Sequence, residues 1–304
     1  MSPSGSNKTV RELIQVTSEY LADRGIESAR LNAERLLADV LGLARIELYF
    51  QHDRPVMGKE LDEFRDLVRL RAGGQPLQTI LGQTEFYSHL FKVLPGVFIP
   101  RPETEHLVEA AANLLGGGTH RLLAPVAVEI GCGTGVVGIS LAMDLPRLTL
   151  HATDINPKAI ELTRHNAHAL GVEARVHVHH GSRFDPLPDH LKGEVDILVS
   201  NPPYIRCGDI EGLSEEVKGH DPHTALDGGQ DGLDFYHALA AALKCWLRPG
   251  GYVAVEIGCD QGAEVQDIFS GVGAEDIVVI KDYSDRDRVV TARVGVAEND
   301  REDG

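Results

Sequence analysis

Cysteine is scarce in this chain of 304 residues, and the four thiols form no C-x-x-C pair. Their spacing gives neither a zinc module nor a disulfide framework, so reduced thiols in a cytoplasmic protein are the simplest interpretation. The chain also lacks an apolar run long enough to span a membrane. Its first ten residues, MSPSGSNKTV, contain no apolar signal core and no arginine-rich pattern. We therefore interpret them as a short disordered tail and expect no membrane association.

Positive charge is also in short supply. Lys and Arg total 29 against 46 Asp and Glu, which gives a net charge of −17. Residues 1–80 are nearly neutral, with 11 basic and 12 acidic residues, so nearly all of the negative charge lies in the remainder. A duplex-DNA-binding protein needs a cationic surface to meet the phosphates. The balance therefore argues against duplex DNA as a substrate, although a local basic patch could be hidden in the total, and we expect no stable nucleic-acid binding.

The first 80 residues have the pattern of a small helical bundle. Apolar residues of 10–21 recur at helical spacing. A second helix is predicted to start at Ser28 as N-cap and to stop at Gly42, and a third covers 58–74. From residue 83 to 100 the chain is rich in aromatic and β-branched residues, which predicts a hairpin that links two domains.

After residue 124, apolar strands alternate with helices. The predicted strands are VAVEI, LTLHATD, ARVHVHH, VDILVSN and GYVAVEIG, with helices over 136–145, 157–170 and 231–247 between them. This alternation predicts an α/β fold with a mostly parallel sheet covered on both faces. A late pair, DIVVIKD and DRVVTARV, predicts an antiparallel edge.

A glycine-rich turn follows the first of these strands. VAVEIGCGTG places Gly131, Gly133 and Gly135 where the backbone can approach a ligand closely. The second strand ends in Asp154, whose carboxylate can accept both ribose hydroxyl hydrogens. A tight turn and a helix N-cap are the structural alternatives, but the two features in this order favour a nucleoside cofactor. EIGC recurs at 256, without a glycine-rich loop after it.

The kind of nucleoside follows from spacing and charge. G-x-G-x-G differs from the dinucleotide pattern G-x-G-x-x-G, so the third glycine is misplaced for a pyrophosphate. Acidic strand ends suit a ligand that carries positive charge. S-adenosylmethionine (SAM), a sulfonium with an amino acid tail, fits this description. Glu129 could bear on the methionine end or could cap the strand.

The fourth strand ends abruptly at SNPPYI, residues 200–205. Two prolines cannot continue a central strand, because neither has a backbone N–H. The Asn201 side-chain carbonyl and the Pro202 backbone carbonyl can accept the two hydrogens of a planar NH₂ group, and Tyr204 can stack on it. Acceptors that hold both hydrogens out of the amide plane favour the tetrahedral nitrogen of a methyl-transfer transition state. A Pro-Pro turn with a packed tyrosine is the structural alternative.

Five segments together carry a family resemblance over about residues 10–294: NPPY, EIGCGTG, FIPRPETE, HTALDGGQDGL and KDYSDRDRVV. The chain resembles the release-factor glutamine N5-methyltransferases, the HemK/PrmC family. NPPY alone is shared with adenine-N6 methyltransferases. IPRPETE ahead of the glycine loop, with a helical domain in front, is far more specific.

The resemblance implies a seven-stranded, mostly parallel class I methyltransferase core in 101–304. It also implies an N-terminal helical substrate-docking domain in 1–80 and a β-hairpin linker in 81–100. The residues that it implies for SAM are Gly131, Cys132, Gly133, Thr134, Gly135, Asp154, Arg183 and Asn201.

The implied substrate is the glutamine of the Gly-Gly-Gln loop of class I peptide chain release factors. Asn201, Pro202, Pro203 and Tyr204 bind this glutamine, and Asn201, Pro202 and Tyr204 are the implied catalytic residues. Arg101 and Glu103 help to shape the mouth of the site, or else form a salt-bridged helix N-terminus.

The chain departs from the family pattern at two places. Ser182 and Arg183 stand where family members often carry an acidic residue, so adenine recognition is expected to differ. His220-Asp221-Pro222 replaces an aromatic-Glu-Pro sequence.

Fourteen histidines, especially HVHH at 177–180, raise the question of a metal site. Without nearby carboxylates in the sequence, we interpret them as surface or half-buried side chains and expect no metal. Two other functions remain open: an amino-group methyltransferase acting on a ribosomal-protein glutamine or a nucleic-acid adenine, and a non-catalytic SAM-binding regulator.

Overall fold

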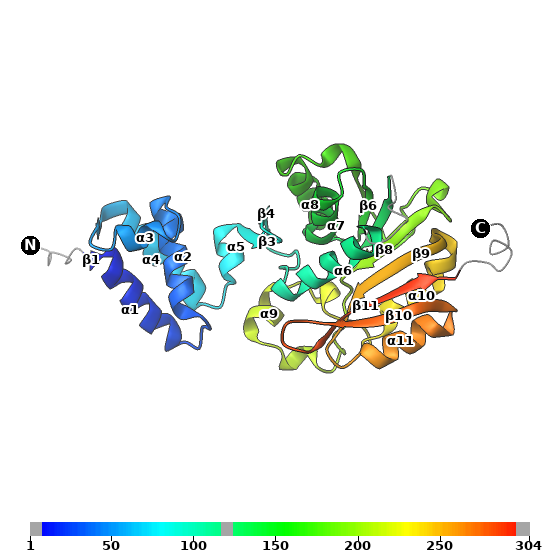
Figure 1. The fold of residues 1–304 in the computed structure, drawn as a ribbon. Helices are drawn as coiled ribbons and strands as arrows, with labels where there is room; N and C mark the ends of the chain where they lie inside the picture. Colours follow the sequence, from blue (N-terminus) through cyan, green and yellow to red (C-terminus); the bar gives the residue numbers. More distant parts are fainter. Residues whose placement is uncertain (1–7, 117–123, 296–304) are drawn as a thin grey trace, which may run out of the picture. The chain divides into compact units, whose positions relative to one another are not determined.

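The computed structural model describes residues 8–116 and 124–295, so the expected N-terminal tail lies almost entirely outside the described residues. The chain divides into two compact units. A helical unit contains Met1–Gln83 and the short segment Glu215–His220, and a larger α/β unit contains Thr84–Ser214 and Asp221–Gly304 (Figure 1). The division falls between residues 83 and 84, within the segment 81–100 that we expect to link the two domains. No helix in the two described ranges has the length and apolarity needed to cross a membrane.

The helical unit is built from short amphipathic helices around an apolar core. Its elements are β1 (Lys8–Thr9), α1 (Val10–Ala22), α2 (Ala29–Leu41), α3 (Glu47–Phe50), β2 (Pro55–Val56), α4 (Gly58–Ala72), α5 (Leu77–Leu81) and α9 (Glu215–His220). Leu36, Leu37 and Phe64 are almost fully buried at its centre. The predicted bundle is present, and the four-residue helix α3 was not predicted because it is shorter than the periodicity can reveal.

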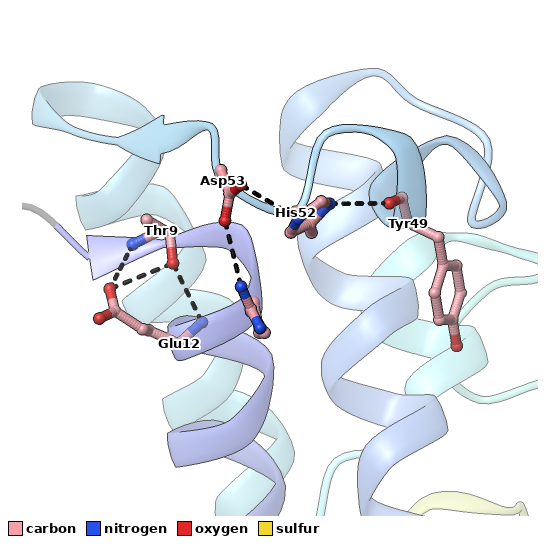
Figure 2. A network of polar contacts seen from close by, with 6 residues as sticks. Thr9, Glu12, Tyr49, His52 and Asp53 are labelled. Atoms are coloured by element: carbon pink, nitrogen blue, oxygen red, sulfur yellow. Dashed lines mark hydrogen bonds and ion pairs between the residues drawn. The ribbon is translucent and has the colours of Figure 1, made fainter.

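Local capping sets the ends of these helices. Thr9 and Glu12 form a reciprocal capping box at the start of α1 (Figure 2), which satisfies two backbone N–H groups that the helix leaves unpaired. Gly42 ends α2 as predicted, in the left-handed conformation with φ of 62°. The prediction for Ser28 was partly wrong: it precedes α2, but its φ is 50° and its side chain makes no capping hydrogen bond. Asn32 instead donates from Nδ2 to the carbonyls of residues 27 and 28.

The α/β unit contains a seven-stranded sheet with strand order β10-β11-β9-β8-β5-β6-β7. The strands are β5 (Val126–Ile130), β6 (Thr149–Asp154), β7 (Val176–His180), β8 (Val195–Ser200), β9 (Leu247–Glu256), β10 (Ala274–Lys281) and β11 (Asp287–Val294). Only β11 runs antiparallel to both of its neighbours. The predicted late antiparallel pair is present, with β10 at the edge. The mostly parallel seven-stranded sheet is thus confirmed.

Helices cover both faces of this sheet (Figure 1). The longer ones are α6 (Glu105–Gly116), α7 (Val136–Asp144), α8 (Pro157–Ala169), α10 (Asp234–Trp246) and α11 (Gly262–Gly271), and single turns lie at η1 (Pro102–Thr104), η2 (Glu173–Arg175), η3 (Asp189–Leu191), η4 (Ile210–Gly212) and η5 (His223–Ala225). Apolar side chains alternate between the two faces: Ile197 packs with the core under α6 and α7, whereas its neighbour Leu198 packs with the core under α10 and α11. A sheet buried on both faces explains the nearly continuous apolar strands.

The hairpin of β3 (Gln83–Phe86) and β4 (His89–Lys92) is shorter than the predicted segment 83–100. Phe86 and Phe91 are buried in the core of the α/β unit, with their rings edge to face. Asn166 of α8 holds β4 by accepting from the backbone N–H of Lys92 and donating to its carbonyl. The hairpin is therefore packed into the α/β unit as part of its core.

Parallel strands place their carboxyl ends on one edge of the sheet. Strand β5 lies between β8 on one side and β6 on the other, so the connections that leave β5 and β8 diverge. Ligands of open α/β sheets bind at such a switch point, beyond the carboxyl ends of the strands. The glycine-rich turn, Asp154 and SNPPYI all lie at this edge.

Candidate active site

The glycine-rich turn joins β5 to α7 and is fastened to the end of β6. The backbone N–H groups of Gly131 and Cys132 both donate to the Thr153 carbonyl, at 2.9 and 3.0 Å. Gly131 and Gly133 have φ of 73° and 54°, the left-handed region that favours glycine. No protein atom lies within 4 Å of where a Cβ would stand on either. The turn therefore presents bare backbone to the cleft.

Gly135 has a different role from the two glycines before it. It precedes α7 with φ of 80°, and a Cβ there would lie 2.8 Å from both Ile139 Cδ1 and Thr163 Cγ2. Thr163 of α8 also donates to the Gly133 carbonyl. Gly135 thus permits close packing of α7 against α8 and does not line the cleft.

Two carboxylates give the cleft an acidic wall. Asp154 accepts from the backbone N–H of Gly133 at 2.9 Å and from that of Asn156 at 2.8 Å, while burial raises its pKa. Glu129 is 3% exposed and accepts from the Gly138 N–H at 3.2 Å. Burial raises the pKa of Glu129 to about 8. Asn156, and not Asp154, caps α8 with its side chain, and each Asp154 oxygen keeps a second lone pair that can accept from a ligand.

The SNPPYI segment leaves β8 at the same edge. Asn201 donates from Nδ2 to Thr104 Oγ1 at 3.2 Å. Within the described ranges, no protein donor bonds to Asn201 Oδ1 or to the Pro202 carbonyl. The Tyr204 hydroxyl donates to Glu256 Oε1 at 3.3 Å, and burial raises the pKa of this phenol well above its usual value. Tyr204 is therefore neutral at physiological pH and contributes its ring face, not a base.

A second loop, residues 226–232, holds the SNPPYI segment by hydrogen bonds. Ile205 donates to the Leu226 carbonyl at 3.0 Å, and Gly228 donates back to the Ile205 carbonyl at 2.8 Å. Gln261 donates from Nε2 to the carbonyls of Tyr204 and Gly232 at 3.1 and 3.2 Å. The HTALDGGQDGL segment is thus a structural support for the turn that carries Asn201.

These elements enclose one cleft of about 250 Å³. The sequence-predicted residues that line it are Gly131, Cys132, Gly133, Thr134, Asp154, Arg183, Asn201, Pro202, Pro203 and Tyr204. Cys132 itself is buried, with Sγ 3.4 Å from Thr163 Oγ1. Arg183 is the one cationic side chain among the described residues that line the cleft, and its guanidinium lies 5.3 Å from the centre of the Phe235 ring.

Several lining residues were not predicted. Thr104, Ile155, Leu226 and Phe235 line the cleft, and Ile155, directly after Asp154, is 54% exposed. Thr104 lies inside the quoted RPETE segment, so a signal for it existed. Nothing in the local sequence predicts that Phe235 lines the cleft, because it belongs to α10, which starts eighty residues after the end of β6.

Arg101 and Glu103 do not line the cleft. Arg101 bonds through Nη2 to Asp221 Oδ2 at 2.7 Å, and Asp221 Oδ1 accepts from the Ile99 N–H. This ion pair favours the structural alternative for Arg101. The ion pair also shows a partner for Asp221, which belongs to the His220-Asp221-Pro222 sequence that departs from the family pattern. Glu103 is exposed.

The histidines of β6 and β7 stack on one another. His151 Nδ1 lies 3.1 Å from His179 Nε2, and its ring centre is 4.9 Å from that of His177. Burial and these neighbours lower the pKa of His151 to about 4. The described residues contain no group of three or more His, Cys, Asp or Glu side chains placed to hold a metal ion.

Comparison with known proteins decides the family. The profile for the PrmC N-terminal domain matches residues 12–82, and that for the methyltransferase small domain matches 91–213. The release factor glutamine methyltransferase of Geobacter sulfurreducens is 42% identical over 94% of this chain and 97% of its own length. The chain belongs to the release factor glutamine methyltransferase family. The Moorella thermoacetica member is 40% identical over 93% of this chain and 98% of its own.

A solved structure supports the fold alone. The hMettl16 catalytic domain in complex with the MAT2A 3′UTR hairpin 6 superposes with a TM-score of 0.55 at 15% identity, over 77% of this chain and 83% of that chain. This likeness supports the α/β architecture of the larger unit.

Proposed function

We propose that this protein transfers a methyl group from SAM to the side-chain nitrogen of the glutamine in the Gly-Gly-Gln loop of class I peptide chain release factors. The observation that carries the proposal is the pair of oxygen acceptors at SNPPYI. Asn201 Oδ1 and the Pro202 carbonyl share one short, clamped turn at a cleft whose other side is a glycine-rich turn with an acidic wall.

The residues of the cleft fit SAM. Bare backbone at Gly131 and Gly133 admits a ligand closely, Ile155 offers an apolar surface for an adenine ring, and Asp154 stands where a ribose would be bound. Glu129 and Asp154 are two acidic groups against one arginine among the described lining residues, and a bound cation would favour the ionised form of Glu129, whose pKa burial raises to about 8. Bound SAM supplies an electrophilic methyl carbon attached to a sulfonium.

The chain's own residues make the amide nitrogen reactive. An amide nitrogen is a weak nucleophile because its lone pair is delocalised into the carbonyl. Asn201 Oδ1 and the Pro202 carbonyl accept one amide hydrogen each and favour the tetrahedral nitrogen of the transition state. The new N–C bond would form as the S–CH₃ bond breaks, with a neutral thioether as the leaving group, and the nitrogen would then give one proton to water. The Tyr204 ring lies against the amide plane. Because the turn is held by residues 226–232 and by Gln261, the acceptors need little reorganisation.

The helical unit has the features of a docking domain for the folded release factor. Ile46 and Phe50 expose 62% and 80% of their surface at and just before α3. One glutamine side chain supplies little binding energy, so a protein substrate must be held elsewhere as well. We place that contact on the helical unit and keep the cleft for the Gly-Gly-Gln loop.

The decisive experiment is mass spectrometry of a release factor incubated with the protein and SAM. We expect one added methyl on the glutamine of Gly-Gly-Gln, and none on a factor in which alanine replaces that glutamine. Asn201→Ala should lower kcat about 100- to 1000-fold, because it removes one acceptor used in the transition state. Its affinity for SAM by calorimetry should change little. Near-normal turnover by this variant would reduce SNPPYI to a structural turn.

A further inference from the structure

Glu256 is a buried carboxylate behind the active site. It ends β9, is 1% exposed and does not line the cleft. Oε1 accepts from the Tyr204 hydroxyl at 3.3 Å. Thr104 lowers the pKa of the same carboxyl through a side-chain hydrogen bond, yet Oε2 has no partner with full hydrogen-bond geometry in the described part of the chain. A buried carboxylate is costly unless its oxygens are used, so its place between two active-site hydroxyls calls for a function.

The direction of each hydrogen bond in this group can be worked out. An ionised carboxylate only accepts, so the side-chain hydrogen bond through which Thr104 lowers the pKa of Glu256 runs from the Thr104 hydroxyl to the carboxylate. The Thr104 oxygen then has only lone pairs to offer Asn201. Those lone pairs accept the Nδ2 hydrogen at 3.2 Å, and the Asn201 amide is thereby held with Oδ1 as its remaining acceptor.

We infer that Glu256 is a positioning residue that acts through Thr104 to hold Asn201 with its carbonyl oxygen, and not its NH₂ group, toward the substrate amide. The opposite amide orientation would present a donor to a substrate NH₂, which is itself a donor. This inference rests on the proposed function, because only a substrate with N–H groups needs an acceptor at that place.

The β10–β11 hairpin keeps a positive charge beside Glu256. Arg288 of β11 bonds to Asp282 Oδ2 at 3.1 Å, and its side chain is 13% exposed. Burial, the largest effect, raises the pKa of Glu256, and the charge of Glu103 raises it as well, whereas Arg288 lowers it; with the hydrogen bonds included, the pKa is raised to about 7. The KDYSDRDRVV segment thus acquires a role: it stabilises the acceptor-only form of Glu256.

Isosteric substitutions test this arrangement in the full-length protein. Thr104→Val removes the hydroxyl and keeps the shape, and Glu256→Gln keeps the shape but offers a donor as well as an acceptor. We expect each to lower kcat roughly 10- to 100-fold with labelled SAM and a release factor, since misoriented groups cost that much. Thr104→Ser, which keeps the hydroxyl, should restore most of the loss. The double variant Thr104→Val/Glu256→Gln should be no slower than the slower single variant, because both break one chain of contacts.

The pH profile separates positioning from a merely structural role. Protonation of Glu256 adds a donor, so wild-type kcat should fall about tenfold between pH 8 and pH 6, and Glu256→Gln should remove this dependence. Calorimetry should give an unchanged SAM affinity for every variant, which shows that the fold is kept. Thr291→Val, which removes a buried hydroxyl from β11, serves as the matched control and should keep wild-type kinetics.

The outcomes distinguish the inference from the proposed function. A wild-type protein that does not methylate the release factor overturns both together. An active wild type with an equally active Thr104→Val, or with a pH profile that Glu256→Gln leaves in place, overturns the positioning role alone. Loss of kcat in Thr104→Val with rescue by Thr104→Ser supports it, even if Glu256→Gln does not fold.

Discussion

Gly232 belongs to the loop of residues 226–232, which holds the SNPPYI turn, and lies close to that turn. Its φ is 78°, and an added Cβ would stand 2.5 Å from the Tyr204 carbonyl oxygen and 2.7 Å from Gln261 Nε2. Real Cβ atoms do not approach other atoms so closely, so Gly232→Ala must move the turn or the glutamine. We expect this substitution to damage both stability and catalysis.

The magnitude can be built from separate contributions. A left-handed alanine costs about 1–2 kcal/mol. Gln261 makes two hydrogen bonds in this contact, and each contributes about 1 kcal/mol. Gly232→Ala should therefore lower the free energy of unfolding by about 3–4 kcal/mol. Because a displacement near 1 Å at a catalytic group can reduce the rate about 100-fold, kcat should fall by one to two orders of magnitude.

Gly193→Ala provides a matched control. Gly193 has a similar φ of 74°, but nothing lies within 4 Å of its added Cβ, so it carries the left-handed cost without the clash. Urea denaturation should show a loss of about 1–2 kcal/mol for this control, with kcat unchanged. If Gly232→Ala were no less stable and no slower than Gly193→Ala, residues 226–232 would not position the turn, and the reasoning would be wrong.

Three further predictions follow from other parts of the molecule. Asp154→Ala should weaken SAM binding by about 1–3 kcal/mol in calorimetry, since it removes an acceptor from the ligand and from the Gly133 N–H; unchanged affinity would contradict our ribose placement. The pKa of His151 is lowered to about 4 in the folded state, so the stability that depends on its neutral form is complete above about pH 6.5 and is lost as the pH falls toward 4. Urea denaturation should show that the free energy of unfolding decreases by at most about 2 kcal/mol between pH 7 and pH 5. His151→Phe should make this decrease smaller. Replacing both Ile46 and Phe50 with serine should raise KM for the intact release factor several-fold and leave methylation of a short Gly-Gly-Gln peptide as slow as before. Leu90→Ser, at another exposed apolar residue, is the control. An unchanged KM in the double variant would argue against docking at Ile46 and Phe50.

The parts of the fold that depend on local pattern were predictable. Apolar alternation and glycine punctuation located all seven strands of the sheet, since burial on both faces leaves nearly continuous apolar runs. The glycine turn and SNPPYI were found because their residue types are required by backbone geometry. The side-chain role of Ser28 was misjudged, because its backbone has a left-handed φ of 50° and its side chain makes no capping hydrogen bond, and this conformation is not visible in local sequence.

The contacts behind the site could not be predicted from local pattern. Thr104, Glu256 and Arg288 are 32 to 184 residues apart in the chain, and Glu256 and Arg288 come together because β9 pairs with β11. Gly135 looks like Gly131 in the sequence, yet its missing Cβ makes room for Ile139 and Thr163 and not for a ligand. Only tertiary packing separates these two reasons for a glycine.

The position of β5 between β6 and β8 also bears on how such a protein can evolve. The residues that we assign to the nucleoside of the cofactor follow strands β5 and β6. The SNPPYI turn, residues 226–232 that hold it, and Glu256 follow or end β8 and β9, on the other side of β5. The methyltransferase small-domain profile stops at residue 213, before residues 226–232, which hold the SNPPYI turn, and before the last three strands of the sheet. Selection on the amino group to be methylated can therefore change the later segments while the nucleoside half is inherited unaltered, so one sheet edge can serve a succession of substrates.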